Sequence, residues 1–479
     1  MQKLKTSLIV LLGCLIFQHC TPSAGPAEEK DTADKISEYL TTIESQGFDG
    51  AVLVAQKGEI LVSDGYGLSD VEKNIRNTDS TIFDIGSITK QFTAAGILKL
   101  EMAGKLSVND LMSKYFANVP DDKKGITLHQ LLTHSAGFPG AIGDDYEDIT
   151  TADFISLAMS KPLMFNPGSG YEYSNVGYSL LAMIIEKVSG KPYETYLHDN
   201  LFQPAGMNNT GYLLPKWNGS LIATGYRNDI RWGKPTEKWT SGSISWHLKG
   251  NGGILSTVKD MYKWHQALLT DDILSAEAKE KYYTPFVREG EGANSFYAYG
   301  WAIFPTPRNT NLVAHNGGNG IFFADFLRYL DEKVTIIVMC NRSTRYANRI
   351  ASQIAGIIFT PDFVPTYPEG SGVELNQEET LAIGNGFVEA IAQPDSAKWE
   401  SFIRDNFSEE LFGFVSMDEH LKFFRSFHDD LKDAKMATMD ISNNIIQITY
   451  DTGKEVVLIT LELDQMPSGE IKLGGIMVD

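Results

Sequence analysis

The chain has 479 residues, of which 43% are hydrophobic and 21% are charged, so its length allows two or three domains of ordinary soluble composition. Its formal net charge of −20 argues against nucleic acid as a partner, because phosphate binding needs a basic surface. None of its three cysteines belongs to a cysteine–histidine cluster with zinc-ligand spacing, and no metal or organic cofactor is expected.

Residues 1–20 have the features of an export signal. Lys3 and Lys5 precede an apolar run that is too short to span a bilayer. The segment resembles a bacterial lipoprotein signal, in which a cysteine just after the apolar run is lipidated. The residues before Cys14 fit the usual motif of such signals better, whereas a polar tether follows Cys20, and we favour Cys20. We expect an exported lipoprotein, periplasmic or in the cell envelope, that its N-terminal lipid holds at the membrane.

Residues 33–360 indicate an α/β (α+β) domain, in which an antiparallel sheet is flanked by helices and joined to a helical subdomain. The irregular stretch 213–249 is expected either to wall a binding site or to be mobile. Cys340 lies in an apolar run, which is typical of a packed core thiol. Apolar periodicity predicts helices at 35–46, 87–100, 106–115, 127–132, 151–159, 175–188, 258–269 and 345–358, and strands at 50–56, 59–63, 297–303, 311–314, 320–330 and 333–341.

Prolines and glycines mark a linker at 361–373, and a small α+β domain is expected over 374–479. This domain is similar to the cone-shaped NTF2-like fold, which implies a docking or shielding role with an unknown partner. Its predicted helices span 378–391, 397–407 and 417–431, and its three predicted strands lie around 445–450, 455–463 and 470–478.

The pair Ser87 and Lys90 carries the first chemical signal. Gly86 lets the chain turn sharply into a helix, so Ser87 lies near a helix start, where developing negative charge is favoured. Lys90 lies one turn further on the same face, and a lysine with a lowered pKa can take the proton of a serine nucleophile. Ser-x-x-Lys also occurs at Ser256 and Lys259, where it is typical of a turn and helix start, so this motif alone is weak.

Two further clusters lie far along the chain. Tyr173, Ser174 and Asn175 end a loop rich in glycine and proline, and His315, Asn316 and Gly317 lie on a predicted strand. In this order, Ser-x-x-Lys, Tyr-Ser-Asn and His-Asn-Gly resemble serine hydrolases related to class C β-lactamases and D-Ala-D-Ala carboxypeptidases. The resemblance covers residues 33–360 and implies the β-lactamase/transpeptidase-like fold.

The resemblance also implies a role for each residue. Ser87 would attack a carbonyl carbon and form an acyl-enzyme. Tyr173 would be the base, its phenol pKa lowered by the nearby Lys90. Asn175 would hydrogen-bond with Lys90 and with the substrate amide. The backbone N–H groups of Ser87 and Gly318 would form the oxyanion hole.

The third motif departs from the family pattern. β-Lactamases of this type carry Lys-Thr-Gly there, and the lysine helps to bind the substrate carboxylate, whereas this chain has His315 and, after it, Gly317 and Gly318, which let a substrate backbone approach closely. A mostly neutral histidine weakens that anion site. The expected function is an exported serine hydrolase for a small ester or a D-amino-acid peptide. The alternatives are a true β-lactamase and a non-hydrolytic penicillin-binding or sensor module.

Overall fold

The computed structural model describes residues 26–227, 230–239, 242–290, 292–342, 347–367, 376–408, 411–412, 416–442, 445–453, 456–466 and 470–478. The predicted signal segment with Cys14 and Cys20 lies outside the described residues, as does the second half of the predicted linker. Among the helices that are described, none combines the length and the apolar character needed to cross a membrane.

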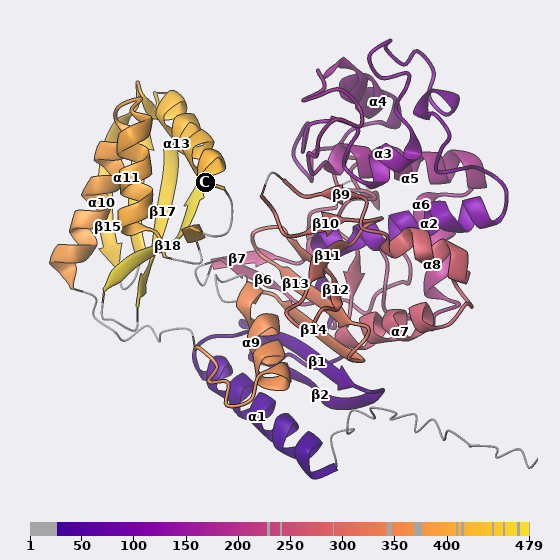
Figure 1. The fold of residues 1–479 in the computed structure, drawn as a ribbon, viewed down its shortest axis with the longest axis horizontal. Coiled ribbons are helices and arrows are strands. Elements are labelled where there is room, and N and C mark those ends of the chain that lie inside the picture. The colour runs from indigo at the N-terminus through magenta and orange to yellow at the C-terminus, as the bar shows by residue number, and fades with distance from the viewer. Residues whose placement is uncertain are drawn as a thin grey trace, which may run out of the picture.

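One antiparallel sheet runs through the larger body, with the strand order β2-β1-β14-β13-β12-β11-β10-β9 (Figure 1). Side chains alternate between its faces, so Val52 and Val54 contact one helical layer and Leu53 contacts the other. The strands are β1 (Gly50–Gln56), β2 (Glu59–Tyr66), β9 (Val287–Arg288), β10 (Phe296–Tyr297), β11 (Ala302–Pro305), β12 (Asn311–Gly318), β13 (Phe323–Tyr329) and β14 (Val334–Cys340).

Helices cover both faces of this sheet (Figure 1). The outer face packs against α1 (Pro26–Ser45) and α9 (Ala347–Phe359), which share a hydrophobic core with β1, β13 and β14. The inner face packs against α2 (Thr89–Met102) and α7 (Val258–Leu269), where Phe92 and Trp264 are in contact. The catalytic candidates on α2 and β12 therefore meet at the inner face.

The helical subdomain continues the inner layer (Figure 1). Its largest helix, α5, packs lengthwise on α2 and ends at Gly190, whose φ of +69° is a left-handed helix stop. The predicted helix at 106–115 is wrong: the only helical turn that the structure describes there is a 3₁₀ turn, Met112–Lys114. The helices on this side are α3 (Leu128–Leu132), α4 (Thr151–Ser160), α5 (Asn175–Ser189), α6 (Tyr193–Leu197) and α8 (Ala276–Tyr283).

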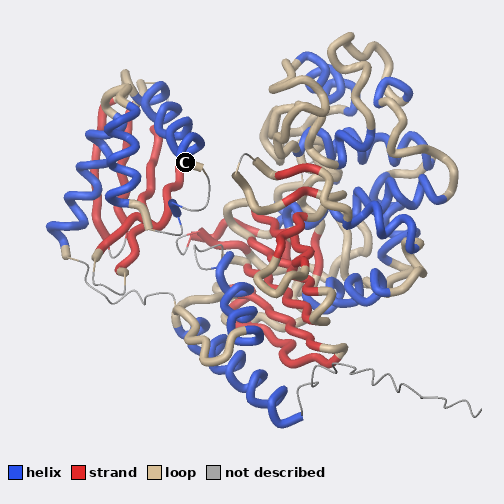
Figure 2. Tube along the Cα trace, viewed as in Figure 1, coloured by secondary structure: helices blue, strands red, loops and turns tan. Residues whose placement is uncertain are grey.

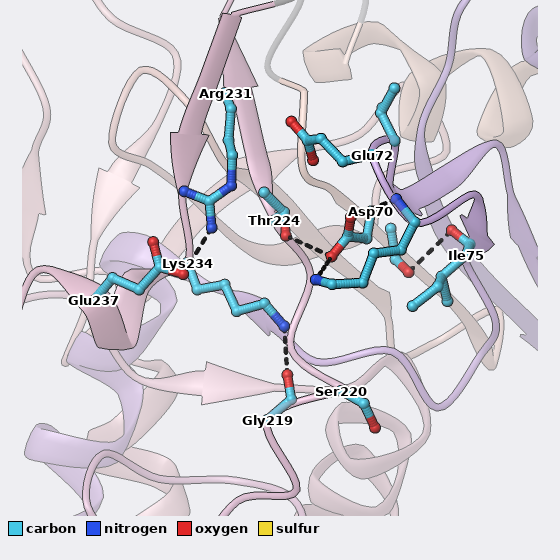
Figure 3. A network of polar contacts seen from close by, with 12 residues as sticks. Asp70, Glu72, Ile75, Gly219, Ser220, Thr224, Arg231, Lys234 and Glu237 are labelled. Carbon is cyan, nitrogen blue, oxygen red and sulfur yellow. Dashed lines mark hydrogen bonds and ion pairs between the residues drawn. The ribbon is translucent and has the colours of Figure 1, made fainter.

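The segment 213–249, predicted to be irregular, contains a short hairpin of β6 (Gly225–Arg227) and β7 (Ile230–Gly233). Figure 3 shows part of its polar network: the Thr224 hydroxyl donates to Asp70 of the β3–β4 hairpin (Leu68–Asp70 and Ile75–Arg76) over 3.4 Å, and the Lys234 ammonium donates to the Gly219 carbonyl within the segment itself. The Thr224 contact attaches the segment to the body that holds the catalytic candidates, and the Lys234 contact holds the segment together.

The C-terminal body has its own hydrophobic core and its own sheet, β15-β16-β17-β18 (Figure 2). The structure shows four strands where three were predicted. The missed strand, β15, carries a bulge between Met436 and Thr438 that breaks the two-residue alternation on which the prediction depends. The NTF2-like likeness stays a prediction. The elements are α10 (Gln377–Ile391), α11 (Ser396–Asn406), α13 (Met417–Leu431), β15 (Lys435–Ser442), β16 (Ile445–Asp451), β17 (Val456–Gln465) and β18 (Ile471–Val478).

Candidate active site

Ser87 lies in a tight turn between the short strand β5 (Phe83–Asp84) and α2. The Asp84 carboxylate accepts a hydrogen bond of 2.8 Å from the Gly86 N–H, which fixes the turn. Gly86 has a φ of +48°, a conformation that glycine adopts more readily than other residues. A 3₁₀ turn, Gly86–Ile88, then leads into α2, so Ser87 is presented at the start of a helix.

Lys90 is fully buried below Ser87, one turn into the helix. Its Nζ lies 3.1 Å from Ser87 Oγ. The same nitrogen lies 2.8 Å from Asn175 Oδ1 and 2.8 Å from the backbone oxygen of Asn251. Burial lowers the pKa of the Lys90 amine well below its ordinary value, because the ammonium form would lose its water. The amine is therefore stabilised in its neutral form.

The contacts of Lys90 orient that neutral amine. A neutral amine has two hydrogens and one lone pair, and Asn175 Oδ1 and the Asn251 carbonyl oxygen only accept hydrogen bonds. They therefore take both hydrogens. In this neutral form the lone pair is left for the third contact, where it can accept the proton of the Ser87 hydroxyl, whose oxygen lies 3.1 Å away. This arrangement is what removal of the serine proton requires.

Tyr173 lies next to both residues: its phenol hydrogen-bonds with Ser87, and Lys90 Nζ lies 4.6 Å from its ring centroid. The expectation of a lowered phenol pKa is wrong. Burial raises the pKa of Tyr173 above its ordinary value of 10.0, because a phenolate would lose its water. Lys90 does not offset this cost, since burial disfavours its own charged form as well. Burial therefore favours the protonated phenol and the uncharged amine over their charged forms in the resting site.

The third motif lies on β12, whose backbone packs directly against the Ser87 turn. A Cβ added at Gly317 would lie 2.1 Å from the Ile85 oxygen and 2.5 Å from the Ser87 nitrogen. A Cβ added at Gly86 would lie 2.5 Å from the Gly318 nitrogen. The two backbone segments meet this closely only because both positions are glycine. The N–H groups of Ser87 and Gly318, the predicted oxyanion donors, belong to these adjoining segments.

His315 is held as a neutral ring. Its Nδ1 donates to the Asn316 carbonyl oxygen over 2.6 Å, so Nε2 carries no hydrogen and accepts from the Tyr297 hydroxyl over 2.9 Å. Burial lowers the pKa of His315 to about 3. The lysine of the related β-lactamases is thus replaced by a group with no charge at neutral pH.

His134 supports the loop that carries Tyr173 and Asn175. Its Nδ1 accepts a hydrogen bond of 3.0 Å from the Ser174 N–H, and its ring centroid lies 4.3 Å from that of Tyr173. Its φ of +57° is a strained conformation for a residue with a side chain. The ring thereby fixes the position of the Tyr-Ser-Asn loop.

The second Ser-x-x-Lys pair makes no such site. The Ser256 hydroxyl is buried and hydrogen-bonds with Thr210 over 2.8 Å, while Lys259 forms an ion pair of 2.6 Å with Asp79. Thr257 caps α7. This motif therefore has a structural role, at the end of a strand and the start of a helix.

Four contributors were not assigned to the site from the sequence: Asp84, His134, Asn251 and Tyr297. Asn251 acts through its backbone oxygen, which no side-chain pattern reveals; the one available signal is the Gly-Asn-Gly-Gly run at 250–253, which is typical of a non-regular loop. Tyr297 reaches His315 from a neighbouring part of the sheet.

A cavity of about 480 Å³ opens at Ser87. It contains no lysine or arginine among the described residues that line it. No group of three or more potential metal ligands occurs within the described part of the chain. The lining residues are Ser87, Tyr173, Glu289, Tyr297, Ala302, Phe304, Leu312, Ala314, His315, Asn316, Gly317, Gly318, Asp325 and Leu327.

Residues 32–356 match the family model described as Beta-lactamase. The chain belongs to the β-lactamase family. It is 31% identical over 349 residues to "Penicillin-binding protein 4*" of Bacillus subtilis (strain 168), a match covering 69% of this chain and 77% of the relative. It is 36% identical over 275 residues to the "Putative penicillin-binding protein PbpX" of the same strain, covering 57% of this chain and 66% of that protein.

Two solved structures show the same fold. The penicillin-binding protein from Bacillus halodurans matches with a TM-score of 0.58 and 29% identity, covering 66% of this chain and 99% of that one. The octameric penicillin-binding protein homologue from Pyrococcus abyssi matches with a TM-score of 0.60 and 23% identity, covering 93% of this chain and 95% of that one. The β-lactamase family member described here is thus a serine hydrolase of the penicillin-binding-protein type.

Proposed function

We propose that this β-lactamase family member cleaves an ester or amide bond through an acyl-enzyme on Ser87. The observation that carries the proposal is the buried amine of Lys90, whose two hydrogens are bound by Asn175 and Asn251 and whose lone pair faces the Ser87 hydroxyl. A serine needs such a base, because its hydroxyl is a weak nucleophile at neutral pH.

In the acylation step, the Ser87 oxygen bonds to the substrate carbonyl carbon while its proton moves to the Lys90 amine. The negative charge that develops on the carbonyl oxygen is stabilised by the N–H groups of Ser87 and Gly318. The carbon–leaving-group bond then breaks, and the leaving atom takes a proton. A water molecule, deprotonated in the same way, releases the acyl group and restores Ser87.

Tyr173 is suited to pass that proton to the leaving group. Its phenol hydrogen-bonds with Ser87 and lies over the Lys90 amine, so it contacts both the donor and the acceptor of the first step. Because its pKa is raised, it acts as a phenol that gives and regains one proton. This role differs from that of a standing phenolate base.

The substrate is a small ester or a D-amino-acid peptide. The unpaired edge of β12 favours an extended acyl chain, because β11 pairs with β12 only as far as Ala314 and leaves the backbone of 315–318 available on that side. The family model described as Beta-lactamase favours the alternative of a β-lactamase, and the relatives named as penicillin-binding proteins favour a module that binds penicillin. The neutral His315 argues against the β-lactamase, because a penicillin carboxylate finds no cation there.

Intact-mass spectrometry tests the proposal. The protein is mixed with a p-nitrophenyl ester and, separately, with a penicillin. Rapid turnover of the ester with little turnover of penicillin supports the esterase or peptidase function, rapid turnover of penicillin supports the β-lactamase, and a lasting penicillin adduct without turnover supports a sensor module. Ser87→Ala should abolish every adduct, whereas Ser256→Ala, the matched control in the other Ser-x-x-Lys motif, should keep them. An adduct on the Ser87→Ala variant would refute the nucleophile.

We also propose export of this hydrolase, with lipidation at Cys20. The positive start and the short apolar run before Cys20 support this proposal. Expression of the whole chain in a bacterium should place it in the membrane fraction, and Cys20→Ser should release it whereas Cys14→Ser should not. Release by Cys14→Ser alone would assign the anchor to that residue instead.

A further inference from the structure

The cavity at Ser87 extends around the edge of β12 to the other face of the sheet. His315 and Gly317 line it from the inner face, where the Ser87 turn lies. Ala314 and Leu327 also line it, and both belong to the outer hydrophobic core under α9. A cavity with linings from both faces must pass around the strand edge that β11 leaves unpaired after Ala314. We call its part beyond that edge the outer arm.

The outer arm is an apolar channel with one acid in it. Ala302, Phe304, Leu312, Ala314 and Leu327 supply apolar walls, and Asp325 supplies the carboxyl group. Asp325 pairs with Asn316 across β12 and β13, so the two side chains share the outer face. In the described part of the chain, the only hydrogen bond to the Asp325 carboxylate comes from the backbone N–H of Phe326, and no cation contacts it.

Both charged side chains that line the cavity are acids. Glu289 lies on the catalytic side, where its carboxylate accepts a hydrogen bond of 3.1 Å from the Tyr171 hydroxyl. Asp325 lies in the outer arm. Burial raises the pKa of Asp325, because no counter-charge offsets the water that its carboxylate loses. A ligand with a positive charge would supply that counter-charge, whereas a ligand carboxylate would be repelled.

We propose that the outer arm binds a positively charged group of the substrate, an ammonium or guanidinium, and that Asp325 is the residue that recognises it. The inference rests on the proposed function, since it names the charge of the substrate that the same Ser87 site would cleave. It also predicts that this enzyme rejects the negatively charged substrates that a cation in the third motif would select.

The distance from Gly317, beside the Ser87 turn, to Asp325 in the outer arm suits one substrate molecule. Adjacent Cα atoms are ~3.8 Å apart and paired Cα atoms of an antiparallel ladder ~5 Å apart, so Asp325 lies roughly 9 Å of backbone from Gly317. An extended chain covers this with about three residues or six to eight methylene groups. The positive charge would therefore lie that far from the scissile carbonyl.

The test uses three p-nitrophenyl octanoates, which carry seven methylene groups and differ only at the far end of the acyl chain: trimethylammonium, tert-butyl or carboxylate. We expect kcat/KM to fall in that order, with about a hundredfold between the first and the last, because the ammonium ester forms one ion pair with Asp325 and the carboxylate ester is repelled by it. Asp325→Asn should lower the ammonium-to-tert-butyl ratio by about tenfold, and turnover of the tert-butyl ester by this variant shows that it folds.

Binding without chemistry separates this inference from the proposed function. Calorimetric titration of the wild-type protein should show binding of hexyltrimethylammonium and none of hexanoate, and Asp325→Asn should abolish the difference. Equal binding of the two would overturn the inference even if the esters acylate Ser87; selective binding without acylation would support the inference and overturn the hydrolase. Loss of the preference in Glu289→Gln but not in Asp325→Asn would overturn the assignment to the outer arm.

Discussion

Replacing Gly317 with alanine tests whether the contact between β12 and the Ser87 turn forms the oxyanion hole. The new Cβ would lie 2.1 Å from the Ile85 oxygen and 2.5 Å from the Ser87 nitrogen, whereas ordinary contacts begin at 3.4 Å. The backbone must therefore retreat by 1.3 Å at the first atom and by 0.9 Å at the second. Both atoms belong to backbone that Asp84 and the start of α2 hold in place, so the retreat cannot be absorbed by a side-chain rotation.

A displacement of this size removes one oxyanion donor from its working position. The loss of such a donor costs about 3–4 kcal/mol in transition-state stabilisation, or 10²–10³ in kcat. We expect Gly317→Ala to lower ester acylation by this factor, measured by stopped-flow release of p-nitrophenol. Gly318→Ala is the matched control, because its Cβ would meet only the Phe322 oxygen at 3.3 Å and a Phe323 ring carbon at 3.6 Å. It should stay within a few-fold of wild type.

The comparison of the two variants decides the outcome. Thermal unfolding of both should show that each is folded at the assay temperature, so a selective loss of acylation in Gly317→Ala reports on geometry. If Gly317→Ala acylates as fast as Gly318→Ala, the approach of the two backbone segments is not required for catalysis, and the oxyanion hole must be sought elsewhere.

Three further predictions concern the groups around the serine. The acylation rate should rise with pH and level off well below pH 10.5, because only the neutral Lys90 amine accepts a proton and burial lowers its pKa. Lys90→Arg should lower the acylation rate by about 10³-fold or more, and the control Lys259→Ala should leave it unchanged. A rate that falls as pH rises would contradict the neutral base. Tyr173→Phe should lower the release of poor leaving groups by about 10²-fold and that of p-nitrophenol less, and equal losses for both would refute proton transfer to the leaving group. Burial raises the pKa of Asp84 from 3.8 to about 7. Stability is therefore lost as pH rises from about 4 to about 7, where the carboxyl is ionised in the unfolded chain and still protonated in the folded one. The unfolding temperature of wild type should fall relative to that of Asp84→Asn over this range, and a parallel pH dependence of the two would be the contrary result.

The sequence could predict the chemistry of the site better than its electrostatics. The three motifs named Ser87, Lys90, Tyr173, Asn175 and His315, and the structure brings these five side chains to one cleft. A motif carries the types and order of residues. It does not carry the extent to which the surrounding fold excludes water, and burial is what reverses the expected pKa shift of Tyr173.

The fold shows a similar limit. Long apolar strands such as β14 were predicted within a residue or two, because all seven of its residues are buried. Strand 297–303 was predicted as one element, yet the structure divides it into β10 and β11 around Gly300, which has a φ of +75°. A Cβ at Gly300 would lie 2.7 Å from the Lys90 oxygen, so this turn packs against the catalytic helix. Such a long-range contact leaves no local pattern in the sequence.

The burial of Lys90 has a consequence for how this protein tolerates change. The amine is 0% exposed, and exclusion of water is the largest influence on its pKa. Dissolved salt screens exposed charges and acts little on groups that water does not reach. Substitutions of acidic or basic residues on the surface, or a change in salt concentration, should therefore have little effect on the pKa of the Lys90 amine. Its strongly negative exterior and its uncharged reaction centre are free to vary independently.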